Sequence, residues 1–164
     1  LHHLDLTQPL PTPTTPPTYT LRHLTGPDDA PARATIHRTA FTQPGHPPSR
    51  VTTDSYRTVM NTDPYNPHLD WIACTPDGTP AAISLIWYDP HHHDALIEPT
   101  GTHPAHRRRG LATATTLAAL HTARDLGART ARVTTRDNDP APRALYQTLG
   151  FRPHTRTTTY HRPT

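Results

Sequence analysis

The residues of this sequence most suited to chemistry form a short basic turn, Arg107-Arg108-Arg109-Gly110-Leu111-Ala112. An extended-looking segment ending at Pro104 precedes the turn, and an Ala- and Leu-rich run typical of a helix follows it. The first N–H groups of a helix lack partners within the helix, and the aligned peptide dipoles place about half a positive charge there. Gly110 removes the Cβ that would keep an anion away from the backbone. The turn therefore predicts a binding site for a phosphate or diphosphate.

A glutamate and a proline stand together in the segment that leads to this turn. Residues 95–103 are expected to form a strand, with Glu98 and Pro99 in its middle. Because proline has no N–H to donate to a β ladder, we expect this strand to bulge at Pro99 or to part from a neighbour there. A strand that parts from its neighbour would leave an opening beside the phosphate-binding turn.

Hydrophobic periodicity and turn residues predict the elements that position these groups. The clearest is a hairpin, in which the turn Pro76-Asp77-Gly78-Thr79 joins strands over 69–75 and 81–88. Further strands are expected at 19–24, 95–103, 129–135 and 151–160, and helices at 30–41, 53–60, 109–126 and 140–148. Hairpins together with one crossover predict an α/β fold with a mixed, mostly antiparallel central sheet and flanking helices.

The proline and threonine content divides the chain into two parts. Residues 1–17 are rich in Pro and Thr and poor in apolar residues, which favours an extended linker or tail over a packed element. Residues 18–164 are expected to form a single domain, which is long enough to bury one core. A linker of this kind could join the domain to a preceding one.

Composition and charge exclude several classes of protein. The formal net charge is +3 and the isoelectric point is near 9.4, which suits anionic ligands but is too weak to predict nucleic-acid binding. No apolar run approaches the roughly 20 residues that span a bilayer, so we expect no membrane segment. Cys74 is the single cysteine, so no disulfide can form within the chain and a cytoplasmic location is expected. All 16 basic residues are arginine, which reflects nucleotide bias in the genome or avoidance of self-acylation.

Two other groups of reactive residues have ordinary explanations. His91, His92 and His93 are consecutive, so in a strand they would point to opposite faces, and no second set of ligands accompanies them. With 14 histidines in the chain, we attribute this run to composition and predict no metal site. Cys74 is expected to face a core, because nothing basic lies beside it in the sequence to activate a thiolate.

Two motifs taken together resemble the GNAT superfamily of N-acetyltransferases. The acyl-CoA signature of that superfamily, Arg/Gln-x-x-Gly-x-Gly/Ala, is met by Arg107 to Ala112. A second signature, Asn-x-x-Ala-x-x-Leu-Tyr-x-x-x-Gly-Phe, is matched with one shift by Asn138, Ala141, Ala144-Leu145-Tyr146 and Gly150-Phe151. Pro142 stands where helix formers are common. The motifs lie in the expected order, about 30 residues apart, on two predicted helices.

A weaker resemblance concerns the organisation of the whole protein. Residues 70–87 and 98–104 are similar to a bacterial group of GNAT domains that often occur in tandem. This similarity would explain the Pro/Thr-rich segment as the connection to another domain. A preceding domain or a homodimer is therefore the expected protein partner, with no nucleic acid and no membrane.

The resemblance implies how acetyl-CoA would be held. The pyrophosphate would lie on the N–H groups of the turn and the first helical residues, and the pantetheine arm would pair with the parted strand edge. The expected binding residues are Thr100, Gly101, Thr102, Arg107, Arg108, Arg109, Gly110, Leu111, Ala112, Thr113 and Asn138. The Thr100 and Gly101 amides could also stabilise an oxyanion. Asn138 is alternatively a helix cap.

The same resemblance assigns two catalytic roles. Tyr146 would donate a proton to the departing CoA thiolate; without the motif around it, it would be a core aromatic residue. An alkylamine has a pKa of about 10 and must lose a proton before it attacks, and Glu98 would act as the base directly or through water. Glu98 is alternatively an ordinary half-exposed carboxylate or a group that orients the substrate.

These residues predict an enzyme that transfers an acetyl group from acetyl-CoA directly to a primary amine, through a ternary complex. The expected acceptor is a small molecule, with a protein or peptide as the alternative. A different function is also compatible with the motifs, namely a non-catalytic CoA-binding module that regulates or scaffolds a larger protein. The presence of Glu98, Asn138 and Tyr146 together favours the enzyme, because a degenerate copy would be expected to lose at least one of them.

Overall fold

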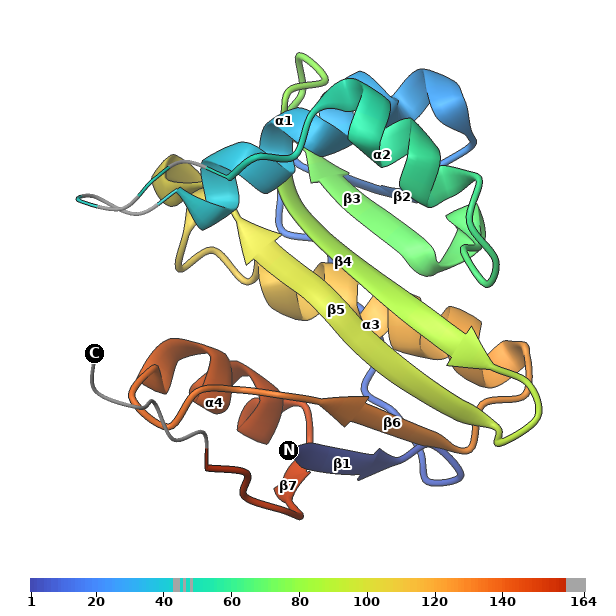
Figure 1. Ribbon diagram of the computed structural model, residues 1–164. Helices are drawn as coiled ribbons and strands as arrows, with labels where there is room; N and C mark the ends of the chain where they lie inside the picture. The colour runs from blue at the N-terminus through green and yellow to red at the C-terminus, as the bar shows by residue number, and fades with distance from the viewer. Residues whose placement is uncertain (43–44, 46, 48, 159–164) are drawn as a thin grey trace, which may run out of the picture.

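A central sheet, observed in a computed structural model, organises the chain, which the structure describes at residues 1–42, 45, 47 and 49–158. Over these residues the sheet has seven strands in the order β2-β3-β4-β5-β6-β1-β7 (Figure 1). The strands are β1 His2–Asp5, β2 Thr20–His23, β3 Asp70–Cys74, β4 Pro80–Asp89, β5 Asp94–Thr102, β6 Thr130–Val133 and β7 Arg152–Pro153. The helices are α1 Ala30–Phe41, α2 Thr53–Met60, α3 Leu111–Asp125 and α4 Pro140–Thr148.

Helices cover both faces of this sheet. Helices α1 and α2 pack on one face over β2 to β4, and α3 lies behind β4 and β5 on the other (Figure 1). One apolar cluster joins Ile36 of α1 and Tyr56 of α2 to Ile83 of β4. A second joins α3 to the opposite sheet face and includes Tyr146 of α4. The predicted α/β class with a mixed, mostly antiparallel sheet is confirmed, since among the strands of the described residues only β5 and β6 pair in parallel.

The irregularity expected at Pro99 is present on both sides of β5. Toward β4, the pairing register shifts between Ser84 and Ile86, opposite the Glu98-Pro99 step. Toward β6, the parallel pairing covers only Asp94–Leu96 against Thr130–Arg132. Beyond Leu96 the two strands are no longer hydrogen-bonded to each other. The strand therefore both bulges and parts from a neighbour, as its proline predicted.

The expectation of an extended linker over residues 1–17 is wrong for its first residues. His2–Asp5 form β1, which lies between β6 and β7 and pairs antiparallel with β6 from His2 opposite Val133 to Asp5 opposite Thr130. Leu6 follows it into the core. A strand of four residues has a weak local signal, and its pairing with a strand more than 120 residues away cannot be inferred from periodicity.

The proline-rich residues 9–17 do lack helix and strand, as predicted, but they pack on the domain. Leu10 contacts the cluster around α3, and the Pro11 carbonyl oxygen lies 2.8 Å from His121 Nε2 on that helix. At the other end of the chain, the strand expected over 151–160 is reduced to Arg152–Pro153. Residues 159 and 160 of that expectation lie outside the described residues.

A buried ion pair fixes α1 to the sheet. Arg33 of α1 donates from Nε to Asp70 Oδ1 of β3 at 2.9 Å, and both side chains are fully buried. The Tyr56 hydroxyl of α2 also donates to Asp70, and the Arg33 guanidinium lies 4.6 Å from the centre of the Tyr56 ring. Removing one partner of a buried ion pair costs about 3–5 kcal/mol, because the other charge is left uncompensated. The orientation of α1 is thereby held by α2 and β3 together.

Candidate active site

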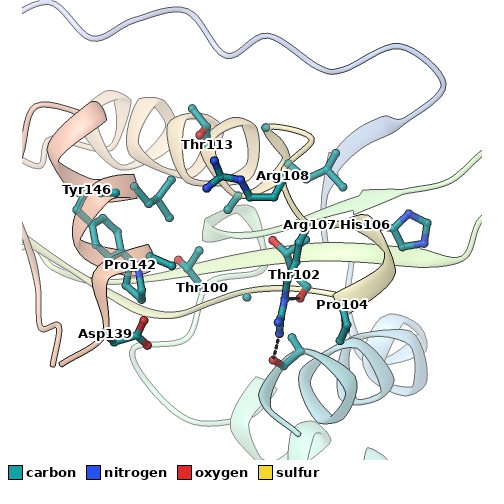
Figure 2. Close-up of a pocket in the computed structure, with 18 of the residues that line it drawn as sticks. Thr100, Thr102, Pro104, His106, Arg107, Arg108, Thr113, Asp139, Pro142 and Tyr146 are labelled. Atoms are coloured by element: carbon teal, nitrogen blue, oxygen red, sulfur yellow. Dashed lines mark hydrogen bonds between the residues drawn. The ribbon is translucent and has the colours of Figure 1, made fainter. Parts of the chain in front are cut away.

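A cavity of about 1260 Å³ opens where β5 and β6 part (Figure 2). Its walls are the C-terminal end of α1, residues 100–102 of β5, the basic turn, the first residues of α3 and one side of α4. The cavity therefore joins the phosphate-binding turn to the tyrosine of the second motif. Of the residues predicted from the sequence, it brings together Thr100, Gly101, Thr102, Arg107, Arg108, Gly110, Leu111, Ala112, Thr113 and Tyr146.

Backbone donors line the end of the cavity at the turn. Gly110 is the N-cap of α3 with φ of 78°, a left-handed conformation that favours glycine, and α3 begins at Leu111. Within the described chain, no hydrogen bond uses the N–H groups of residues 108–113. These donors stand at the positive end of a 15-residue helix. The turn therefore fits a phosphate group, as the sequence predicted.

The three arginines of the turn have different surroundings. Arg108 lines the cavity and is exposed. Arg107 lines it too, but donates from Nη2 to the Ala40 carbonyl oxygen at 3.4 Å, which connects the turn to α1 (Figure 2). Arg109 does not line the cavity, since its Nη1 donates to the Tyr19 hydroxyl at 2.8 Å. Arg108 is thus the arginine whose charge is available to an anion in the cavity.

Close packing between β5 and α1 forms another wall. A Cβ added at Gly101 would lie 2.9 Å from the Ala40 Cβ and 3.0 Å from the Phe41 Cε2. The absence of a side chain at Gly101 therefore lets the end of α1 approach the strand. Phe41 is 40% exposed and lines the cavity, so it offers an apolar surface beside Gly101.

Tyr146 of α4 lines the cavity and is otherwise buried. Burial raises the pKa of the Tyr146 phenol above its ordinary value, and the nearby Thr100 side chain partly opposes that rise. The Tyr146 ring packs against Phe151 with the ring centres 5.5 Å apart. The phenol is therefore protonated at neutral pH, as a proton donor must be, and its raised pKa also makes it a weaker acid than an exposed tyrosine.

Besides Arg109, two more of the predicted residues lie outside the cavity walls. Glu98, the only glutamate of the chain, is exposed, and its backbone carbonyl accepts a 2.8 Å hydrogen bond from Trp87 Nε1. Asn138 is also exposed. Neither lines the cavity, whereas the neighbouring Asp139 does and makes no cap hydrogen bond with its side chain. The sequence analysis did not single out Asp139, because an aspartate before a helix beginning with proline is typical of an ordinary cap.

Cys74 and the histidine run lie outside the cavity walls. Cys74 is buried, and burial raises the pKa of its thiol. Over the described residues, no group of three His, Cys, Asp or Glu side chains is placed to hold a metal ion. His91, His92 and His93 are exposed, and His92 Nδ1 lies 2.6 Å from Asp89 Oδ2. The described part of the chain also contains no helix long and apolar enough to cross a membrane.

Comparison with known families decides the classification. The family model for the acetyltransferase (GNAT) family matches residues 34–151, which include every wall of the cavity. The chain belongs to this family. Members of the GNAT family use acetyl-CoA, so the match accounts for the free N–H groups of the turn and for the cavity that extends from them. No match to the chain is found among the curated proteins.

Solved structures share the fold. A GCN5-related N-acetyltransferase from Sphaerobacter thermophilus is 25% identical with a TM-score of 0.76, and the match covers 92% of this chain and 46% of that one. This chain therefore spans about half the length of that protein. The ribosomal-protein-S18-alanine N-acetyltransferase from Escherichia coli is 22% identical with a TM-score of 0.66, covering 84% and 79% of the two chains. AAC(6')-Iy, in complex with the bisubstrate analogue CoA-S-monomethyl-acetylneamine, is 20% identical with a TM-score of 0.65, covering 89% and 99%.

The contact between Gly101 and α1 leads to a prediction. In Gly101→Ala the new Cβ would push Ala40 away, which should destabilise the fold by about 1–3 kcal/mol and weaken acetyl-CoA binding through the displaced turn. Urea unfolding and calorimetry with acetyl-CoA measure the two effects. Ala40→Gly in the same chain removes the closest contact, so the two substitutions should together cost less than the sum of their separate costs. Additive losses would contradict the proposed contact.

Proposed function

We propose that this GNAT domain transfers the acetyl group of acetyl-CoA directly to a primary amine of a small molecule, through a ternary complex. The observation on which this proposal rests is the cavity that joins the unpaired N–H groups of residues 108–113 to Tyr146. Membership of the GNAT family supports the transfer of an acetyl group.

The donor side of the cavity would be formed mainly by backbone. The N–H groups of residues 108–113 would bind the pyrophosphate, with Arg108 adding charge. The edge of β5 at Thr100 to Thr102, which β6 leaves unpaired, would hold the amide-containing arm. Asn138 and Arg109 would act from beside the cavity, Asn138 on the arm and Arg109 by fixing the turn to Tyr19. When bound, acetyl-CoA supplies the activated acetyl thioester.

Side chains of the protein would donate one of the two protons that the reaction transfers and accept the other. Tyr146 would hold its proton at the cavity for the departing thiolate, because burial keeps the phenol protonated. The acceptor amine must be deprotonated before it attacks. Glu98 would do this directly or through water from its exposed position on β5, two residues before Thr100. Asp139 offers a second carboxylate, and it is the one that lines the cavity.

The acceptor side differs in character from the donor side. Phe41 and Asp139 contribute an apolar ring and a carboxylate to the cavity, which together suit a cationic amine with an apolar portion. The structural neighbours named above acetylate a protein alanine in one case and hold an aminoglycoside-derived analogue in the other. We favour the small molecule because the cavity is wide and open. A preceding domain or a second copy of the chain would be the protein partner.

A screen of acceptors tests the proposal. Acetyl-CoA would be incubated with the protein and with panels of aminoglycosides, polyamines, amino-acid amides and peptides, and release of CoA thiol would be measured. We expect turnover with small amines above the rate without acceptor. Peptide turnover alone would identify a protein acetyltransferase. Calorimetric binding of acetyl-CoA without turnover on any panel would support the non-catalytic module, and absence of binding would contradict both functions.

Tyr146→Phe is expected to separate binding from transfer. The variant should bind acetyl-CoA nearly normally, since the ring and its packing remain, but kcat should fall by about 100-fold or more because the proton donor is lost. Tyr88→Phe, at a tyrosine outside the cavity, is the matched control and should keep the wild-type rate. An unchanged kcat in Tyr146→Phe would remove this residue from the mechanism.

The variant Glu98→Gln tests whether Glu98 is the general base. The rate should fall most at low pH, where nearly all of the amine is protonated and must transfer its proton, and least at high pH, where free amine is available. Asp139→Asn is the comparison, because its carboxylate lines the cavity while Glu98 is exposed. If the pH–rate profile of Glu98→Gln matches the wild type and that of Asp139→Asn does not, the base is Asp139. Two unchanged profiles would assign the role to water or to the substrate itself.

A further inference from the structure

Three polar side chains are linked to one another beside the basic turn. Arg109 Nη1 donates to the Tyr19 hydroxyl at 2.8 Å, and that hydroxyl lies 2.9 Å from His106 Nδ1. The Tyr19 ring is partly buried and packs against the apolar cluster that includes Leu111 of α3. Tyr19 is therefore an anchored group that holds an arginine and a histidine together at the turn.

Counting hydrogens shows which donors of this cluster remain free. The Tyr19 oxygen accepts from Arg109, and among the described side chains the acceptor for the Tyr19 hydrogen is His106 Nδ1. Burial, the neighbouring His103 and Arg109 lower the pKa of His106, so its ring is neutral at pH 7. A neutral ring that accepts at Nδ1 has its hydrogen on Nε2. The His106 Nε2–H group and the other N–H groups of Arg109 are thus left to donate to a ligand.

The charge of Arg109 has no carboxylate partner among the described residues. The ion pairs found there use other arginines, and the Arg109 side chain is exposed. The same holds for Arg108, which lines the cavity. Hydrogen bonds from a guanidinium group to a phosphate are strong because both groups are charged. An exposed, unpaired arginine beside a neutral histidine donor therefore suits a phosphate ester.

The cluster lies at the end of the cavity away from Tyr146. His106 lines the cavity whereas Arg109 does not, so the free donors stand at its rim. Figure 2 shows His106 and Tyr146 on opposite sides, with Thr102 between them. In CoA, the pyrophosphate separates the pantetheine arm from the adenosine and its 3′-phosphate. If the pyrophosphate binds the N–H groups of residues 108–113 and the arm extends toward Tyr146, the 3′-phosphate is left on the side of His106.

We propose that Arg109 and His106 form a binding site for the 3′-phosphate of CoA at the rim of the cavity, with Tyr19 as the residue that positions both. This inference rests on the proposed function for the placement of the pyrophosphate and the arm. The site is separate from the N–H groups of the turn. It lets the domain distinguish acetyl-CoA from pantetheine thioesters that lack this phosphate.

Calorimetry with CoA and with 3′-dephospho-CoA tests the site without turnover. The wild-type protein should bind CoA about tenfold or more tightly than 3′-dephospho-CoA, because the phosphate gains hydrogen bonds from a charged group. Arg109→Gln and His106→Phe each remove a donor and should each lower this ratio by about three- to tenfold. Tyr19→Phe should lower the ratio by a smaller factor, because both donors remain and only the hydroxyl that positions them is lost.

The ratio of the two affinities separates loss of the site from general damage, since a damaged protein loses both ligands together. Arg108→Gln, at the arginine that lines the cavity, should weaken both ligands by the same factor and keep the ratio. Arg129→Gln, at an exposed arginine outside the cavity walls, should change neither affinity. A wild-type ratio near one would overturn the inference, as would a ratio that Arg109→Gln and His106→Phe both leave unchanged.

A second measurement observes the phosphate itself. ³¹P NMR of bound CoA separates the phosphomonoester signal from those of the diphosphate, and a pH titration gives the pKa of the monoester, which is about 6 for an ordinary phosphate ester. Positive charge stabilises the dianion, so this pKa should be lower on the wild-type protein than in free CoA. It should rise toward the free value in Arg109→Gln. A monoester pKa that is the same in bound and free CoA would contradict the site.

Failure of the inference can be distinguished from failure of the proposed function. Turnover with small amines, together with equal affinities for CoA and 3′-dephospho-CoA, would contradict only the phosphate site. A wild-type preference for CoA that is lost in Arg109→Gln, without turnover on any acceptor panel, would contradict the proposed transfer and support the phosphate site. Absence of binding of both ligands would contradict both.

Discussion

The separation of β5 from β6 is the constraint on which the rest of the structure depends. The two strands pair over only three residues each, Asp94–Leu96 and Thr130–Arg132. Pro99 cannot donate to a ladder, and β6 ends at Val133, so the pairing cannot extend farther. A strand edge that a neighbour leaves unpaired is a site for another extended chain, and here it stands beside the N-terminus of α3. The cavity therefore forms because β5 and β6 separate after three paired residues.

Contacts elsewhere in the fold hold both sides of the gap between β5 and β6 in place. On one side, β1 pairs with β6 over four residues and with β7 beyond it, so β6 has a full partner on the edge away from the cavity. On the other side, the buried pair of Arg33 and Asp70 holds α1 against β3. The end of α1 in turn meets Gly101 and receives the Arg107 hydrogen bond. The two walls of the cavity are thus fixed by contacts that lie outside it.

Sequence reasoning succeeded where the signal is local. Gly110 and Pro140 mark the beginnings of α3 and α4, and the residues around Tyr146 placed it correctly at the cavity, because caps and turns depend on a few neighbouring residues. Sequence reasoning failed where the structure depends on contacts between segments that are far apart in the sequence. The strand β1 is defined by its pairing with β6, more than 120 residues away in the sequence. Glu98 was expected to act as the base, and its side chain lies exposed outside the cavity walls, which alternation along a strand cannot show where the register shifts.

The two sides of the cavity also differ in how well a sequence motif can predict them. The donor side is formed largely by N–H groups at the start of α3, which every residue except proline provides, so a glycine at the right position is enough to predict it. The proposed acceptor side is formed by side chains such as Phe41 and Asp139. These residues can be replaced without changing the N-terminus of α3. Family membership therefore indicates acetyl-CoA as the donor that the family uses, whereas under the proposed function the amine would be selected by the particular residues that this chain places around Gly101 and Tyr146.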